Sequence, residues 1–134
     1  MINILFRSSV FLLFQFHALG GDWPNWLGPS GDGISDEYKW KHQLENPHWK
    51  SKVGVGFSSV SIANGKLFTM GHDGRKNGGN ETLHCIDASK GESLWKISYP
   101  APLIDYLHEG GPCSTPTVDG SIVYSISKHG MLHA

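Results

Sequence analysis

The feature that most constrains the fold is an internal repeat. Residues 114–120 repeat the layout of residues 59–65 at a distance of 55 positions, and residues 130–134 begin as residues 81–85 begin. Repetition at such a period is typical of folds in which one small supersecondary unit is copied and stacked. One unit of this kind cannot bury all of its apolar surface alone, so each copy needs a neighbour.

The residues inside one unit indicate β-strands. Residues 57–63 and 66–70 are rich in serine, β-branched and aromatic side chains, and the Asn64-Gly65 pair between them is a strong signal for a tight hairpin. Further strands are expected at 82–87 and 93–99, and no segment shows a helical period. Four strands per repeat predict an all-β chain, specifically a β-propeller of four-stranded blades.

The predicted propeller is partial. The repeat region 49–134 holds about one and a half blades, with one full blade at 57–99 and an incomplete blade at 113–134. A strand around Trp49 is expected to end a preceding unit, because Trp49-Lys50 matches Trp95-Lys96. Closure of a propeller takes about four to eight blades. We therefore expect an N-terminal fragment, from either a truncated gene or a partial sequence.

The first 48 residues differ from the repeats. Residues 1–20 carry one charge, Arg7, followed by an apolar run at 10–16 and small residues, which is the pattern of a secretory signal peptide. This apolar run is too short to span a bilayer, so we expect an exported chain, in the periplasm or cell envelope, without an integral membrane segment after signal removal. Residues 21–48 are expected to form an arm rich in Gly, Pro and Trp, which Trp23 and Trp26 pack onto a larger surface.

Charge and cysteine content narrow the possible partners. The formal net charge is −1, and the sequence contains no cluster of basic residues, so a nucleic-acid partner is not expected. Cys85 and Cys113 are the two cysteines. An exported chain can form a disulfide, but their spacing fits two unpaired thiols equally well.

Residues 85–95 resemble the tryptophan-docking motif of quinoprotein-like (PQQ-like) repeats. In that motif a small residue, an Asp, a Gly and a Trp recur at fixed spacing, here Cys85, Asp87, Gly91 and Trp95. Asp87 is suited to bind the amides of a turn, Gly91 to adopt a positive φ, and Trp95 to be buried between adjacent blades. The chain departs from the motif in having Lys90 where Thr is usual and Cys85 where Ala is usual.

A second resemblance covers nearly the whole chain after residue 20. Its motifs are Trp23-Pro24-Asn25-Trp26, Gly28-Pro29, residues 32–35, residues 56–60, Gly111-Pro112 and residues 114–118. In this order they are similar to exported quinoprotein-repeat propellers of planctomycete-type bacteria, which are often described as similar to the outer-membrane protein assembly lipoprotein. Leu27 departs from the Arg expected there.

The resemblance implies two functions. The first is a non-catalytic exported scaffold or binding module, whose partners are the remaining propeller blades or another protein bound through loops 72–80 and 101–112. The second is the N-terminal part of an alcohol or sugar dehydrogenase that uses pyrroloquinoline quinone (PQQ) and calcium. No cofactor is evident from this chain, and PQQ and calcium are expected only in a full-length relative. An enzyme therefore remains the less favoured reading.

Several residues of suggestive type are not assigned a role. His129 and His133 have a metal-ligand spacing for a helix, but they lie around a glycine in a strand region. His108 is expected to be solvated, with the edge of a binding site as the alternative. Asp32 and Asp36 lack the oxygen ligands of a calcium loop, and Asn80 begins a glycosylation sequon. We assign no catalytic residue and no metal ligand, and cofactor-binding residues stay unknown.

Overall fold

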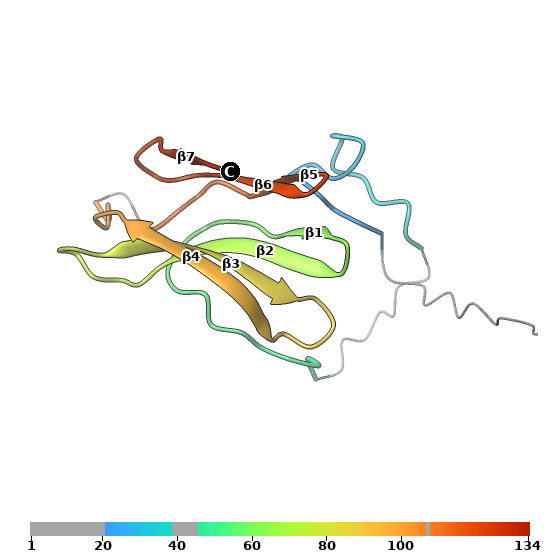
Figure 1. Ribbon diagram of the computed structural model, residues 1–134, viewed down its shortest axis with the longest axis horizontal. Coiled ribbons are helices and arrows are strands. Elements are labelled where there is room, and N and C mark those ends of the chain that lie inside the picture. The colour runs from blue at the N-terminus through green and yellow to red at the C-terminus, as the bar shows by residue number, and fades with distance from the viewer. Residues whose placement is uncertain (1–20, 39–45, 107) are drawn as a thin grey trace, which may run out of the picture.

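The computed structural model describes residues 21–38, 46–106 and 108–134, so the predicted signal peptide at 1–20 lies outside the described residues. Within these ranges the chain has one antiparallel sheet of four strands, a second of three, and no helix. The three-stranded sheet lies over one face of the four-stranded sheet (Figure 1). The all-β prediction is therefore confirmed. None of the described residues forms a helix long and apolar enough to cross a membrane.

The first sheet is a meander in which each strand pairs with the next. Its strands are β1 (Ser61–Ala63), β2 (Lys66–His72), β3 (Asn80–Asp87) and β4 (Ser93–Pro100). The hairpin between β1 and β2 turns at Asn64 and Gly65, whose φ angles are 52° and 71°. Two consecutive positive φ angles suit a tight hairpin, as the Asn-Gly pair predicted. The sheet spans most of the full blade predicted at 57–99.

The second sheet repeats the beginning of the first. Its strands are β5 (Thr117–Asp119), β6 (Ile122–Ile126) and β7 (Leu132–His133). The hairpin closes at the pair Asp119↔Ile122, so its two turn residues are Gly120 and Ser121. The sequence alignment of the two units, which matched Asn64-Gly65 with Asp119-Gly120, is thus wrong by one residue, because Gly120 occupies the first turn position with φ 57°.

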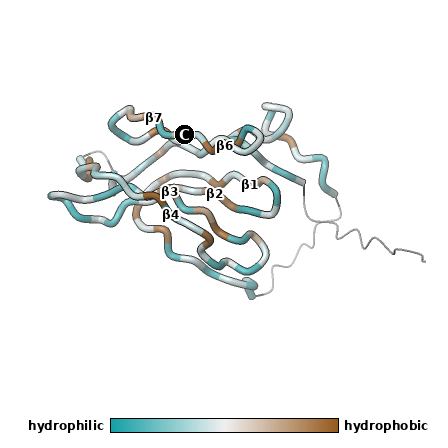
Figure 2. The backbone as a smooth tube through the Cα atoms, in the orientation of Figure 1, coloured by the Kyte–Doolittle hydropathy of each residue, from teal (hydrophilic) through white to brown (hydrophobic). Residues whose placement is uncertain are grey.

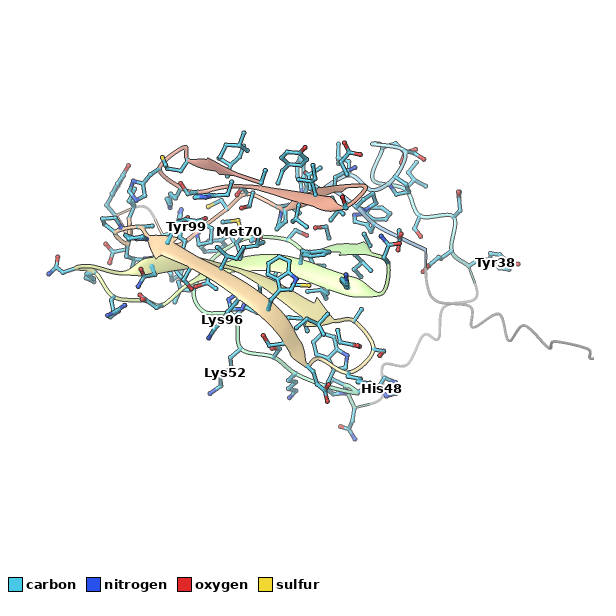
Figure 3. The ribbon with its side chains drawn as sticks, viewed as in Figure 1. Tyr38, His48, Lys52, Met70, Lys96 and Tyr99 are labelled. Atoms are coloured by element: carbon cyan, nitrogen blue, oxygen red, sulfur yellow. The ribbon has the colours of Figure 1, made fainter. Side chains whose placement is uncertain are left out.

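The core lies between the two sheets. Phe68 and Cys85 are cross-strand partners, are 4% and 0% exposed, and pack with Val118 and Val123 of the second sheet. Met70 and Tyr99 point toward the second sheet, whereas Lys96 points to the opposite side (Figure 3). This alternation follows from the period of a strand. Hydrophobic segments occur along β1 to β4, and the hairpin tips and loops are mostly hydrophilic (Figure 2).

No strand forms around Trp49, contrary to the prediction. Residues 46–60 form no named strand and run along the side of the first sheet that faces away from the second sheet (Figure 1). One isolated bridge joins Val55 to His72. A Cβ placed on Gly71 would lie 1.7 Å from the Val53 carbonyl oxygen. Because the segment crosses over the sheet in direct backbone contact, most of its amides have no neighbouring strand to pair with.

The N-terminal arm joins both sheets. Trp23 and Ile62 exchange two backbone hydrogen bonds of 2.8 Å, and the Val118 amide donates to the Pro24 carbonyl at 2.8 Å. Residues 25–33 then turn back on themselves. The expectation that both tryptophans pack down is wrong for Trp26, which is 68% exposed. Only the Trp23 ring is packed, against Gly28 within the arm.

Candidate functional site

The turn between β3 and β4 is held by Asp87. The carboxylate atom Oδ1 accepts hydrogen bonds from the Ser89 amide at 2.9 Å, the Ser89 hydroxyl at 2.6 Å and the Lys90 amide at 3.0 Å. The hydrogen bond from the Ser89 side chain, with those from the two amides, keeps the pKa of Asp87 below its ordinary value. Gly91 ends the turn with φ 74°. Both predicted roles, amide binding by Asp87 and positive φ at Gly91, are confirmed.

Trp49 lies on this turn. Its indole Nε1 donates to the Ala88 carbonyl at 3.1 Å. A Cβ on Gly91 would lie 2.5 Å from two atoms of the Trp49 ring, so the ring rests directly on the glycine backbone. We call this contact between Trp49, Ala88 and Gly91 the Trp49 dock. The sequence identified the turn and the equivalence of Trp49 and Trp95, but it did not foresee that Trp49 occupies this turn.

Trp95 has no such dock in the described part of the chain. Its ring centroid lies 5.9 Å from that of Phe68, and the side chain is 38% exposed. The prediction that Trp95 is buried between two blades is therefore wrong for this chain. One edge of the ring packs toward the inter-sheet core, and the rest faces an open groove.

That groove lies between β4 and the strands β6 and β7, with a volume of ≈ 270 Å³. Its walls are mainly apolar and aromatic: Leu83, Trp95, Ile97, Tyr99, Ile122 and Val123. Two polar atoms of its lining, Ser125 Oγ and His133 Nε2, are buried and have no hydrogen-bond partner. The Tyr99 ring stacks on the His133 ring, with centroids 4.1 Å apart.

Loops 72–80 and 101–112, predicted as binding loops, lie together, and we call them the rim. The buried His72 joins them, because its Nε2 contacts the Ala101 carbonyl at 2.7 Å while its Nδ1 accepts from the Gly74 amide at 2.9 Å. These two partners assign the ring proton to Nε2, since a carbonyl only accepts and an amide only donates. His72 thus fixes the start of both loops.

Backbone and charged groups complete the rim. The Ala101 amide donates to the Gly79 carbonyl at 2.9 Å. Lys76 Nζ lies 2.7 Å from Asp105 Oδ2 and joins the two loops at the surface. The hydrogen bond within this pair raises the pKa of Lys76 and lowers the pKa of Asp105. A loop pair tied at its base and at its tip presents a preformed surface.

A buried carboxylate connects the rim to the second sheet. Glu81 is 1% exposed, and its carboxylate accepts from the Tyr99 hydroxyl at 3.2 Å and from the Lys128 amide at 3.3 Å. Burial, with the adjacent charge of Glu81, raises the pKa of Tyr99. Lys128 Nζ in turn lies 3.1 Å from His108 Nε2 and 3.4 Å from the Ile104 carbonyl. His108, expected to be solvated, is instead half-buried with its ring edge against Phe57.

The sequence missed His72, Glu81 and Lys128. A usable signal was present for the first two. His72 lies four residues after Phe68, and Glu81 lies two residues before Leu83, so strand alternation places both on the core face of the sheet. A buried polar residue at a strand end next to a loop is a reason to expect a loop contact.

The other singled-out residues are not brought together. His129 Nε2 contacts the Pro102 carbonyl, whereas His133 stacks on Tyr99. Asp32 Oδ1 accepts from the Ile34 amide, and Asn80 donates to Asp73. Within the described ranges, no group of three or more His, Cys, Asp or Glu side chains is arranged to hold a metal ion.

Both cysteines are free thiols. Cys85 is fully buried in the inter-sheet core, and its burial raises the pKa of the thiol; Cys113 is exposed. Comparisons with known protein families, with curated proteins and with solved structures found no match for this chain.

Proposed function

We propose that this chain is a non-catalytic exported scaffold of the β-propeller type, which binds another protein through the rim. The observation that carries the proposal is the fixed rim: two loops joined by His72 and Lys76, and connected to the second sheet by Glu81 and Lys128. Loops held on a rigid β-frame are frequent sites of recognition. Exposed rim residues offer charge and aromatic surface, since Arg75, Lys76 and Tyr106 are 62%, 75% and 80% exposed.

The direction in which the sheets stack supports a propeller. The face of the first sheet that carries Phe68 packs on Val118 and Val123 of the second. By hairpin register, Val123 is the equivalent of Leu67, which lies on the other face of the first sheet from Phe68. The contact is therefore heterologous, with unlike faces meeting, and repeated contacts of this kind generate rings when the rotation closes.

The rim is tested by site-directed photo-crosslinking. A photoreactive residue replaces the exposed Tyr106 in the rim, and a control replaces Lys90 in the turn after β3. In cells that normally express the chain, we expect a discrete crosslinked protein from position 106 and none from position 90. Equal crosslinking at both positions, or none at either, would contradict binding through the rim.

Export and the absence of catalysis need separate measurements. Mass spectrometry of the natural product should find a mature N-terminus near Gly21, in the periplasmic or envelope fraction. Dye reduction with alcohols or sugars, in the presence of PQQ and calcium, should stay at the level of the buffer control. Quinone-dependent turnover would contradict the scaffold and favour a dehydrogenase.

A further inference from the structure

We propose that the groove beside Trp95 binds an extended peptide segment that carries a turn like that of residues 87–91. The inference rests on the proposed function, because it treats the two sheets as successive repeat units. It adds the identity of the occupant: a β-strand that lies next to β7, followed by a turn with an accessible carbonyl and a glycine.

The groove continues an interface that is already formed. Val123 belongs both to the inter-sheet core with Phe68 and to the lining of the groove. Beyond Val123, the β4 side chains Trp95 and Ile97 are 38% and 56% exposed. The first sheet has a fourth strand and the second has none. A strand beside β7 would therefore extend the second sheet over the apolar side chains of β4.

The polar atoms of the groove favour a peptide over a purely apolar ligand. Ser125 and His133 are cross-strand partners, as Thr69 and His84 are at the equivalent place in the first sheet. The Thr69 hydroxyl donates to a backbone carbonyl, that of Ser59, at 3.2 Å. Ser125 Oγ, 2% exposed as a residue, has no partner. Because buried polar atoms are nearly always satisfied, the missing partner is best supplied by peptide groups.

The Trp49 dock shows what Trp95 would bind. Trp49 and Trp95 occupy equivalent positions of the repeat, and both are followed by lysine. Trp49 donates to the carbonyl of Ala88 and rests on Gly91, whereas the structure gives the Trp95 indole no hydrogen-bond acceptor among the described residues. An occupant with the same turn would accept the Trp95 indole N–H and receive its ring on a glycine.

The chain supplies its own probe. A synthetic, unlabelled peptide with the sequence of residues 86–100 contains the turn and a following strand, and it is added to the full chain carrying ¹⁵N-tryptophan. The Trp95 indole resonance is assigned with Trp95→Phe. We expect this resonance to shift and its hydrogen exchange to slow about tenfold as peptide is added, because a hydrogen bond forms. The Trp49 resonance should stay in place, since Trp49 is already docked.

Two matched controls make the result specific. A peptide with Gly91→Val should not bind, because any Cβ there would collide with the ring. In the chain, Ile97→Lys should weaken binding at least tenfold, whereas Lys96→Gln, on the opposite face of β4, should not. An unmoved Trp95 resonance at millimolar peptide, or equal shifts with the Gly91→Val peptide, would overturn the proposal. An unchanged Trp49 resonance in each variant reports that the fold is intact.

The groove and the rim fail separately. Loss of peptide binding with crosslinking at position 106 retained removes only the occupant of the groove. Loss of crosslinking with peptide binding retained removes only the protein-binding role of the rim.

Discussion

At the scale of single residues, Gly91 lets an aromatic ring lie on the backbone of a turn. Gly91→Ala should destabilise the chain through both a positive φ and a collision with Trp49. Gly65→Ala is the matched control, because its φ is similarly positive at 71° and nothing lies within 4 Å of the added carbon. Urea unfolding should show a loss about 1–2 kcal/mol larger for Gly91→Ala, in the range typical of overpacking. Equal losses would mean that φ alone decides.

The indole hydrogen bond of Trp49 can be measured against Trp95. Trp49→Phe keeps an aromatic ring but removes the donor to Ala88, and should lower the free energy of unfolding by about 1 kcal/mol. Trp95→Phe removes a donor that has no acceptor among the described residues, so we expect a change within about 0.5 kcal/mol. A larger loss for Trp95→Phe than for Trp49→Phe would show that the dock contributes little.

Asp87 should make stability depend on pH at the acidic end. Its pKa in the folded chain is lowered, chiefly by the Ser89 hydroxyl. A lowered pKa contributes stability that is present above the unfolded value of about 3.9 and is lost as the pH falls through the folded value. Asp87→Asn should therefore unfold at lower urea than the parent at pH 7, and the two midpoints should converge below about pH 3. Parallel midpoints throughout this range would contradict the role of the charge.

At the scale of elements, the rim depends on one buried histidine. His72→Ala removes the contacts to the Ala101 carbonyl and the Gly74 amide. We expect faster hydrogen exchange in loops 72–80 and 101–112, followed by mass spectrometry, with little change in the centre of β3. Lys76→Ala is the control, because an exposed ion pair contributes about 0–1 kcal/mol and should loosen only the tip of the rim. Uniformly faster exchange would mean that His72 supports the whole sheet.

The strands that alternate clearly were predictable, and the connecting segments were not. β2, β3 and β4 follow from alternation and from the turns at Asn64-Gly65 and 87–91. Residues 49–53 also alternate, yet they form no strand, because the backbone there crosses Gly71 instead of pairing along an edge. Which neighbour a segment meets depends on contacts distant in sequence, and a local pattern does not contain that information.

The candidate site was predictable to a similar degree. The loops of the rim and the roles of Asp87 and Gly91 follow from sequence, since loops between strands and turn residues have local signatures. The Trp49 dock needed the packing of one repeat against another. The link from Glu81 to the Lys128 amide joins two sheets, and no local pattern indicates a bond between a side chain and a distant backbone amide.

At the scale of the whole molecule, the arm joins the first strands of both sheets. Deleting residues 21–38 removes the carbonyl acceptors of the Ile62 and Val118 amides. We expect these two amides to exchange faster, by NMR, and the midpoint of thermal unfolding to fall by several degrees, since a loss of about 1 kcal/mol shifts it by that much in a small domain. The Leu83 amide in β3 is the internal reference. An unchanged Val118 amide would show that the sheets need no arm.

The arm also has a consequence for the order of synthesis. Asp22 accepts from the Asn64 amide 42 positions later, and the Ser61 hydroxyl meets a carbonyl 55 positions later. A ribosome adds about 5–20 residues per second, so the earliest segment waits on the order of seconds for its partners. During that time the free edge of β1 is open to other strands, including those of neighbouring nascent chains. The part of the protein that is made first is therefore among the last to be completed.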